Sequence, residues 1–134
     1  MGTTATGTFR TDGLEEQPFY GGRGARLSRT RLVRTFHGEI VGTSEANLIM
    51  TSAGRLEAPA HSGLERFQGA VNGRTGTFVL QHAMIGPFGE QPRTELRIVP
   101  DTGTGELVGI RGSAFINGDD TGGELTFVLD YELD

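Results

Sequence analysis

The chain has 134 residues and a formal net charge of −5, and all 12 of its basic side chains are arginines. A chain of this length is expected to form one domain with a single core. The absence of cysteine excludes disulfides and thiolate chemistry, and the absence of lysine excludes Schiff bases and a P-loop lysine. An acidic chain without a basic tract is not expected to bind nucleic acid.

Alternation of apolar and polar side chains predicts eight strands and almost no helix. In chain order, the strands are expected near residues 3–11, 26–37, 41–51, 63–71, 74–84, 93–99, 108–117 and 123–133. Loops are expected at Gly13–Ala25, Ser52–Ser62, Gly86–Pro92 and Gly118–Gly123, with at most a helical turn around Gly103–Leu107. Short antiparallel strands with one apolar face favour a closed barrel or a sandwich, and closure removes exposed edges.

Two general features support an all-β protein in the cytoplasm. Glycine accounts for 22 of 134 residues, against a usual share of about 7%, and it separates strand-like stretches, as in sheets with bends and bulges. The N-terminus has no signal-peptide pattern, and no apolar run reaches membrane-spanning length. We therefore expect a cytoplasmic protein with no membrane partner.

The Asn72-Gly73 pair is the strongest hairpin signal in the chain, because a type I′ turn needs positive φ at both central residues. The turn fixes the register of its two strands and places Phe67 opposite Phe78 and Gly69 opposite Gly76. Because side chains alternate between faces, one face of this hairpin carries Glu65, Phe67, Val71, Phe78, Leu80 and His82.

Glu65 and His82 form the candidate catalytic pair, since they lie on a diagonal of this otherwise apolar face. Burial raises the pKa of a carboxyl and a neighbouring imidazolium lowers it, a balance that suits general acid–base chemistry. In the alternative, which we prefer, Glu65 has a structural role. An arginine such as Arg97, or backbone near the barrel rim, then satisfies the carboxylate.

The remaining motifs predict no cofactor and no metal site. The glycine-rich runs Gly103–Gly105 and Gly21–Gly24 lack the preceding strand and following helix of a phosphate loop. The three histidines fall in separate segments without metal-ligand spacing, and His61 is interpreted as a solvated loop residue. No serine has the context of a nucleophile elbow.

An ordered set of segments carries a resemblance across nearly the whole chain: Gly7–Phe9, Thr35–Ser44, Gly63–Arg66 with Gly76–His82, Gly103–Gly112 and Leu129–Leu133. Together they resemble a bacterial family of uncharacterised proteins with an allene-oxide-cyclase-like β-barrel. The segment Gly103–Gly112 is also similar to a turn in plant allene oxide cyclases and dirigent proteins. The resemblance implies an eight-stranded antiparallel barrel with a lumen, often in a homo-oligomer, and relatives on this barrel bind or cyclise apolar small molecules.

The first functional expectation is a small barrel that binds an apolar or amphipathic small molecule in its lumen. The lumen residues expected to contact it are Phe36, Met50, Phe67, Phe78, Leu80, Phe127 and Tyr131. One alternative is a cofactor-free isomerase or cyclase in which Glu65 moves a proton or steadies a cation. Another is an oligomeric scaffold with a filled core, in which inward phenylalanines, Phe115 among them, meet at the axis.

Overall fold

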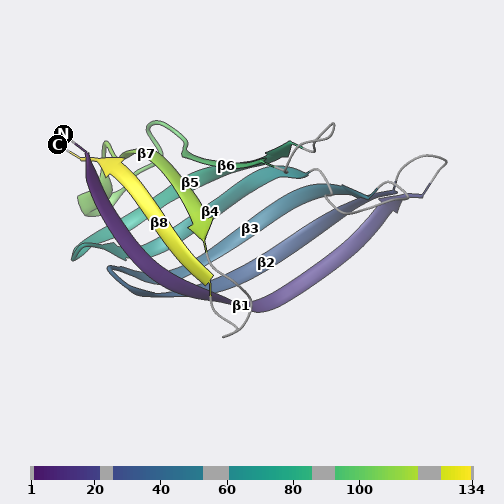
Figure 1. The fold of residues 1–134 in the computed structure, drawn as a ribbon, viewed down its shortest axis with the longest axis horizontal. Helices are drawn as coiled ribbons and strands as arrows, with labels where there is room; N and C mark the ends of the chain where they lie inside the picture. The colour runs from purple at the N-terminus through teal and green to yellow at the C-terminus, as the bar shows by residue number, and fades with distance from the viewer. Residues whose placement is uncertain (1, 22–25, 53–60, 86–92, 118–124, 134) are drawn as a thin grey trace.

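The structure, a computed structural model, describes residues 2–21, 26–52, 61–85, 93–117 and 125–133. The elements are β1 (Thr3–Tyr20), β2 (Arg26–Gly38), β3 (Ile40–Ser52), β4 (His61–Val71), β5 (Arg74–Ile85), β6 (Arg93–Ile98), the 3-10 turn η1 (Gly105–Leu107), β7 (Arg111–Asn117) and β8 (Leu125–Glu132). Each strand pairs antiparallel with the next, and β1 pairs with β8 (Figure 1). The predicted closed eight-stranded barrel is therefore confirmed. No helix in the described ranges is long and apolar enough to cross a membrane.

The β4–β5 hairpin has the predicted register. Asn72 and Gly73 take φ values of 48° and 82°, as a type I′ turn requires. Phe67 lies opposite Phe78, and Gly69 lies opposite Gly76. The two phenylalanine rings are 5.1 Å apart between centroids, so this pair joins the strands on the inner face.

β1 is longer than predicted, because part of the expected loop Gly13–Ala25 continues the strand to Tyr20. A register shift between Thr11 and Gly13 interrupts the strand, and beyond it β1 pairs with β2 alone. A strand with one neighbour tolerates Pro18, since the missing N–H can fall on its unpaired side. Gly13 and Pro18, which indicated a loop, thus lie in a strand that has one neighbour in this region.

Two other boundaries differ from the prediction. β4 begins at His61, which pairs with Met50 and Met84, so the solvated-loop interpretation of this histidine was wrong. β7 begins at Arg111, because the Ile110 N–H donates to the Leu107 carbonyl and turns the chain before the strand. The predicted loops Gly86–Pro92 and Gly118–Gly123, and residues 53–60 of the loop after β3, lie outside the described residues.

Aromatic side chains fill the barrel. Phe9, Phe36, Phe67, Phe78 and Phe127 are each at most 2% exposed. The Phe36 ring lies between 5.3 and 5.6 Å from three of the others, measured between centroids. Leu107 of η1 and Ile110 are also fully buried, so the segment before β7 completes the core.

Phe115 does not join this core, contrary to expectation. It is 46% exposed, because its neighbour Ala114 occupies the buried position on β7 and pairs with Leu96 and Leu129. Because neighbouring side chains on a strand point to opposite faces, the inward Ala114 places Phe115 on the outer face.

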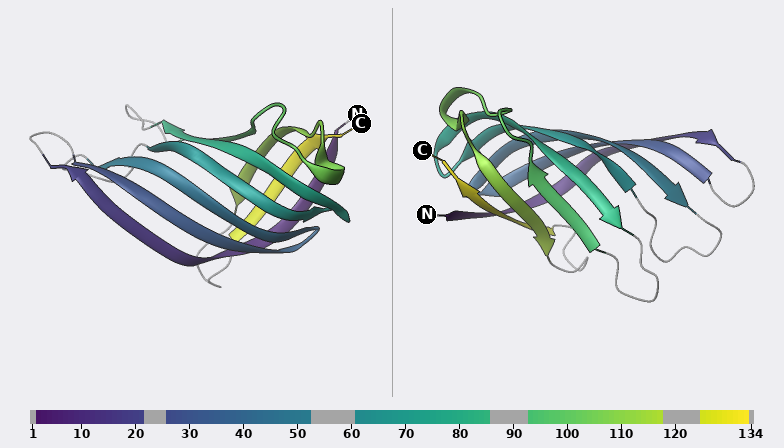
Figure 2. Two further views of the ribbon diagram at one scale, coloured as in Figure 1. Left: turned by 180° about the vertical axis from the view of Figure 1, so that it is seen from behind. Right: turned by 90° about the horizontal axis from the view of Figure 1, so that it is seen from above.

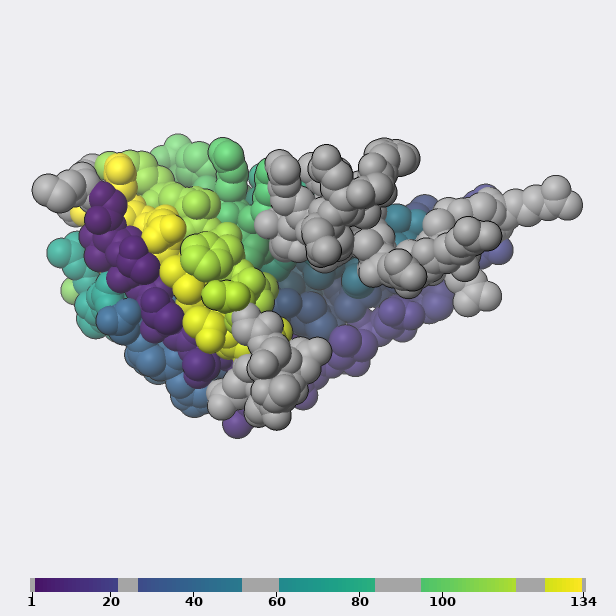
Figure 3. All heavy atoms as spheres, viewed as in Figure 1, coloured from purple at the N-terminus to yellow at the C-terminus, as the bar shows by residue number. Residues whose placement is uncertain are grey.

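The barrel is flared at the end opposite the chain termini, where β1, β2 and β3 project beyond the other strands (Figures 1 and 2). The pairing of β1 with β8 stops at Phe9, and β6 and β7 are paired at two positions, Leu96–Ala114 and Arg97–Ser113. Figure 3 shows atoms of β2 and β3 between β8 and the projecting part of β1. Among the described residues, the inner face of the projecting strands thus has no opposite wall of equal length.

Candidate functional site in the flared end

A cavity of about 550 Å³ lies at the flared end of the barrel. Residues of β1, β2, β3, β4, β5 and β7 line it: Leu14, Thr30, Leu32, Arg34, Leu48, Met50, His61, His82, Phe115 and Ile116. Cavities of a few hundred Å³ with mostly apolar walls and a few polar groups are typical of small-molecule sites. We take this flared-end cavity as the candidate site.

The strand register explains why these side chains meet. Thr30 lies opposite Leu48, Leu48 opposite Gly63, and Gly63 opposite His82, which makes one row across four strands. Met50 and His61 form a pair in the adjacent row. Because residues two apart on a strand share a face, both rows present their side chains to the same cavity.

Glu65 lies beside this cavity and is itself sealed, with no exposed surface. Its Oε1 accepts a hydrogen bond of 3.0 Å from Arg34 Nη1 and lies 2.5 Å from His82 Nε2. Its Oε2 accepts a hydrogen bond from the Ser44 hydroxyl. Both carboxylate oxygens are therefore held, and a cation is paired with the buried negative charge.

The charge state of Glu65 determines which nitrogen of His82 carries a proton. Burial raises the pKa of the Glu65 carboxyl, but the hydrogen bond from His82 and the charge of Arg34 outweigh this effect and hold that pKa below its ordinary value. An ionised carboxylate only accepts hydrogen bonds, so His82 Nε2 must carry a proton and donate it. Nδ1 is therefore the ring nitrogen that does not contact Glu65.

Glu65 and His82 are therefore in contact, but the arginine that pairs with Glu65 is not the expected Arg97. Arg97 is exposed and pairs in register with Gln81 on the outer face, whereas Arg34 of β2 reaches Glu65. Sequence reasoning missed Arg34, Ser44 and His61. The sequence did indicate that Arg34 faces inward, because it has the same phase as Phe36, but its place opposite Ser44 depends on the β2–β3 register, which only the structure shows.

The predicted lumen residues fall into two groups. Six of them are buried in the packed core: Phe36, Phe67, Phe78, Leu80, Phe127 and Tyr131. Tyr131 also accepts a hydrogen bond of 2.8 Å from Asn72 Nδ2. Met50 is half-buried and lines the flared-end cavity. A narrow eight-stranded barrel is filled by its own side chains, so the open space lies beyond the rings.

Three residues that line this cavity each carry a buried polar atom with no hydrogen-bond partner among the described residues: Thr30 Oγ1, Arg34 Nε and His61 Nδ1. Thr30 and Arg34 are only 2% and 8% exposed. A buried polar atom without a partner costs about 1–3 kcal/mol, and such atoms are uncommon in folded proteins. Their gathering around one cavity distinguishes it as the candidate binding site.

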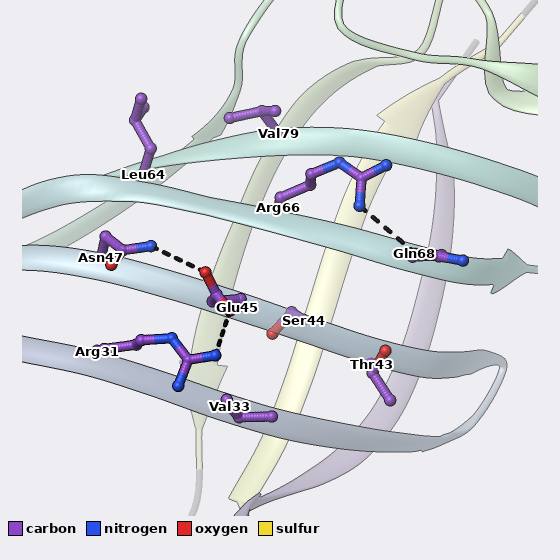
Figure 4. Close-up of a pocket in the computed structure, with 10 residues that line it drawn as sticks. All are labelled: Arg31, Val33, Thr43, Ser44, Glu45, Asn47, Leu64, Arg66, Gln68 and Val79. Atoms are coloured by element: carbon purple, nitrogen blue, oxygen red, sulfur yellow. Dashed lines mark hydrogen bonds and ion pairs between the residues drawn. The ribbon is translucent and has the colours of Figure 1, made fainter. Parts of the chain in front are cut away.

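A second hollow, of about 630 Å³, lies on the outer face of β2, β3, β4 and β5 (Figure 4). Its polar side chains are largely paired with one another. Arg31 contacts Glu45 at 2.6 Å, Asn47 donates to Glu45 at 3.4 Å, and Arg66 donates to Gln68 at 3.5 Å. None of the buried polar atoms that lack a partner among the described residues belongs to a residue that lines the outer hollow.

No group of three or more His, Asp or Glu side chains suited to a metal ion occurs in the part of the chain that the structure describes.

Comparison with known proteins gives a family without an assigned activity. Residues 5–131 match DUF3224, described as a protein of unknown function. A crystal structure of a protein with unknown function from the same family, from Shewanella oneidensis MR-1, is similar to this chain with a TM-score of 0.84 and 28% sequence identity. The similarity covers 100% of this chain and 99% of that one. No curated protein matches the sequence.

Proposed function

The chain belongs to the DUF3224 family of proteins of unknown function, and from the site itself we propose that it binds an amphipathic small molecule in the flared-end cavity. One observation carries the proposal: residues whose buried polar atoms have no partner in the described part of the chain line a cavity whose remaining wall is mostly apolar. A ligand with an apolar body and a polar group satisfies both parts of this surface.

The proposed site differs from the lumen position expected from sequence. A ligand at the barrel axis would have to displace rings that already pack against one another, with the large loss of stability that disrupted cores show. A ligand in the flared-end cavity contacts Leu32, Leu48 and Met50 without moving that core. The allene-oxide-cyclase-like affiliation stays a prediction, on which this proposal does not depend.

A pair of tryptophan variants tests where the ligand binds. Met50 lines the cavity, whereas its neighbour Ile49 is exposed on the other face of β3. Titration calorimetry with decanoate and with decanol should give saturable binding of at least one of them, with one molecule per chain. Met50→Trp fills the cavity and should weaken that binding at least about tenfold, about 1.4 kcal/mol, whereas Ile49→Trp should leave it unchanged.

Thermal unfolding of both variants controls for loss of fold. The proposal fails if neither compound binds the wild-type protein, or if folded Met50→Trp binds as tightly as Ile49→Trp.

Proton transfer within the same cavity is a second candidate function, favoured by the contact between His82 and Glu65. Because Glu65 is sealed and His82 lines the cavity, the roles differ from those expected from sequence. His82 Nδ1 accepts a proton from the bound molecule and returns it, while Glu65 fixes the ring and stabilises the imidazolium. This is the chemistry of a cofactor-free isomerase or cyclase, with His82 as the acid–base group and Glu65 as a positioning residue.

A further inference from the structure

Building on the proposed ligand cavity, we propose that its polar groups take a carboxylate, so that the ligand class is an organic acid with an apolar body. The inference concerns the head group of the ligand, whereas the proposal above concerns only the existence and place of the site. The two can therefore fail separately.

The Arg34 guanidinium supplies the first argument. Its Nη1 is bonded to Glu65, and its central carbon lies 5.0 Å from the centroid of the Phe9 ring. Its Nε–H is buried and has no partner within the described part of the chain. A guanidinium has donors and no acceptor, so the missing partner must be an acceptor atom such as a carboxylate oxygen.

The charge on the cavity wall supplies the second argument. None of the described residues that line the cavity is an Asp or a Glu, whereas Arg34, His61 and His82 all line it. The sealed Glu65 offsets one positive charge, and each proton on a histidine adds another. The described part of the wall is therefore neutral or positive, which favours an anion and disfavours an ammonium group.

Thr30 and His61 supply further donors for the same head group. The Thr30 hydroxyl can donate to a carboxylate oxygen. Burial lowers the pKa of His61, and the charges of His82 and Arg34 lower it further, so its ring is neutral near neutral pH and can donate through Nδ1. With Arg34 Nε, these make three donor atoms for two carboxylate oxygens. A neutral alcohol oxygen has two lone pairs, so it cannot accept from all three donors, and it carries no charge.

Three compounds with the same ten-carbon chain test the head group directly. Titration calorimetry near neutral pH should give decanoate an affinity at least about tenfold higher than decanol, as expected for charge-assisted hydrogen bonds, with no detectable binding of decylamine. Equal affinities for decanoate and decanol, or tighter binding of decylamine, would overturn the carboxylate assignment and leave the cavity proposal standing. Absence of binding by all three would overturn both.

Variants then tie the preference for the acid to the named atoms. Thr30→Val and His61→Phe each remove a donor while nearly preserving volume, and each should reduce the decanoate-to-decanol affinity ratio about threefold or more. Arg31→Gln is the matched control, since Arg31 pairs with Glu45 on the outer face, and its ratio should stay at the wild-type value. A ratio that falls in Arg31→Gln and stays unchanged in Thr30→Val and His61→Phe would place the head group elsewhere and contradict the inference.

Discussion

Replacing Glu65 with glutamine is expected to lower the free energy of unfolding by about 3–5 kcal/mol, the range for breaking a buried ion pair. The amide removes the negative charge while the Arg34 cation stays largely buried beside it. It also cannot accept hydrogen bonds at both former carboxylate oxygens, which now bind Arg34, His82 and Ser44. Urea unfolding followed by circular dichroism measures the loss.

The matched control for this variant is Glu45→Gln. Glu45 is also paired with an arginine, at 2.6 Å from Arg31, but both side chains are more than 40% exposed, and exposed pairs contribute about 0–1 kcal/mol. Equal changes in the two variants would refute the structural role of Glu65. If Glu65→Gln instead melts like the wild type but has altered ligand binding or turnover, the functional role is favoured.

The same variant should change how stability depends on pH. The folded-state pKa of Glu65 lies below its ordinary value of 4.5, so the unfolded chain binds more protons in the window between the two values. The stabilisation from Glu65 is therefore complete above the ordinary value and is lost as the pH falls through the folded-state pKa. Wild-type stability should decline more steeply in acid than that of Glu65→Gln.

Phe36→Ala is the second change with a large expected effect, a loss of about 3–5 kcal/mol on removal of a buried phenylalanine. The Phe36 ring packs against Phe9, Phe67 and Phe127 at the centre of the barrel. The control is Phe19→Ala, because Phe19 is 54% exposed and surface changes usually stay within about 0.5 kcal/mol. Urea unfolding compares the two.

Phe36→Ala also separates the core from the binding site. Phe36 is not among the residues that line the flared-end cavity, so the folded fraction of the variant should bind decanoate or decanol like the wild type. Losses of similar size in Phe36→Ala and Phe19→Ala would contradict the packed core. A selective loss of ligand binding in folded Phe36→Ala would indicate that the ligand binds at the barrel axis instead.

The part of the site that could be predicted depends on one turn. Asn72-Gly73 fixed the β4–β5 register, and the contact between Glu65 and His82 followed from it. The β2–β3 connection carries no comparable signal, since Gly38 turns the chain at φ 110° without an Asn-Gly pair. Without that register, nothing in the sequence related Arg34 to Ser44, or either of them to Glu65 across a third strand.

The cavity itself could not be predicted, because it depends on how far the strands extend and on how much space the rings take up. The sequence placed the end of the first strand near residue 11, whereas β1 continues to Tyr20 and forms part of the flared wall. Likewise, alternation indicated that Phe36, Phe67, Phe78 and Phe127 are inward without showing that they fill the axis. Those features depend on packing in three dimensions.

Nuclear magnetic resonance of the wild-type protein titrated with decanoate tests the central claim, binding in the flared-end cavity, most directly. Signals of the Leu32, Leu48 and Met50 methyl groups and of the His61 ring should shift together and saturate at one ligand per chain. Signals of methyl groups on the outer face, such as those of Val33, Ile49 and Val79, should not shift. Shifts confined to the outer face, or no saturable shift at the cavity residues, would contradict the account.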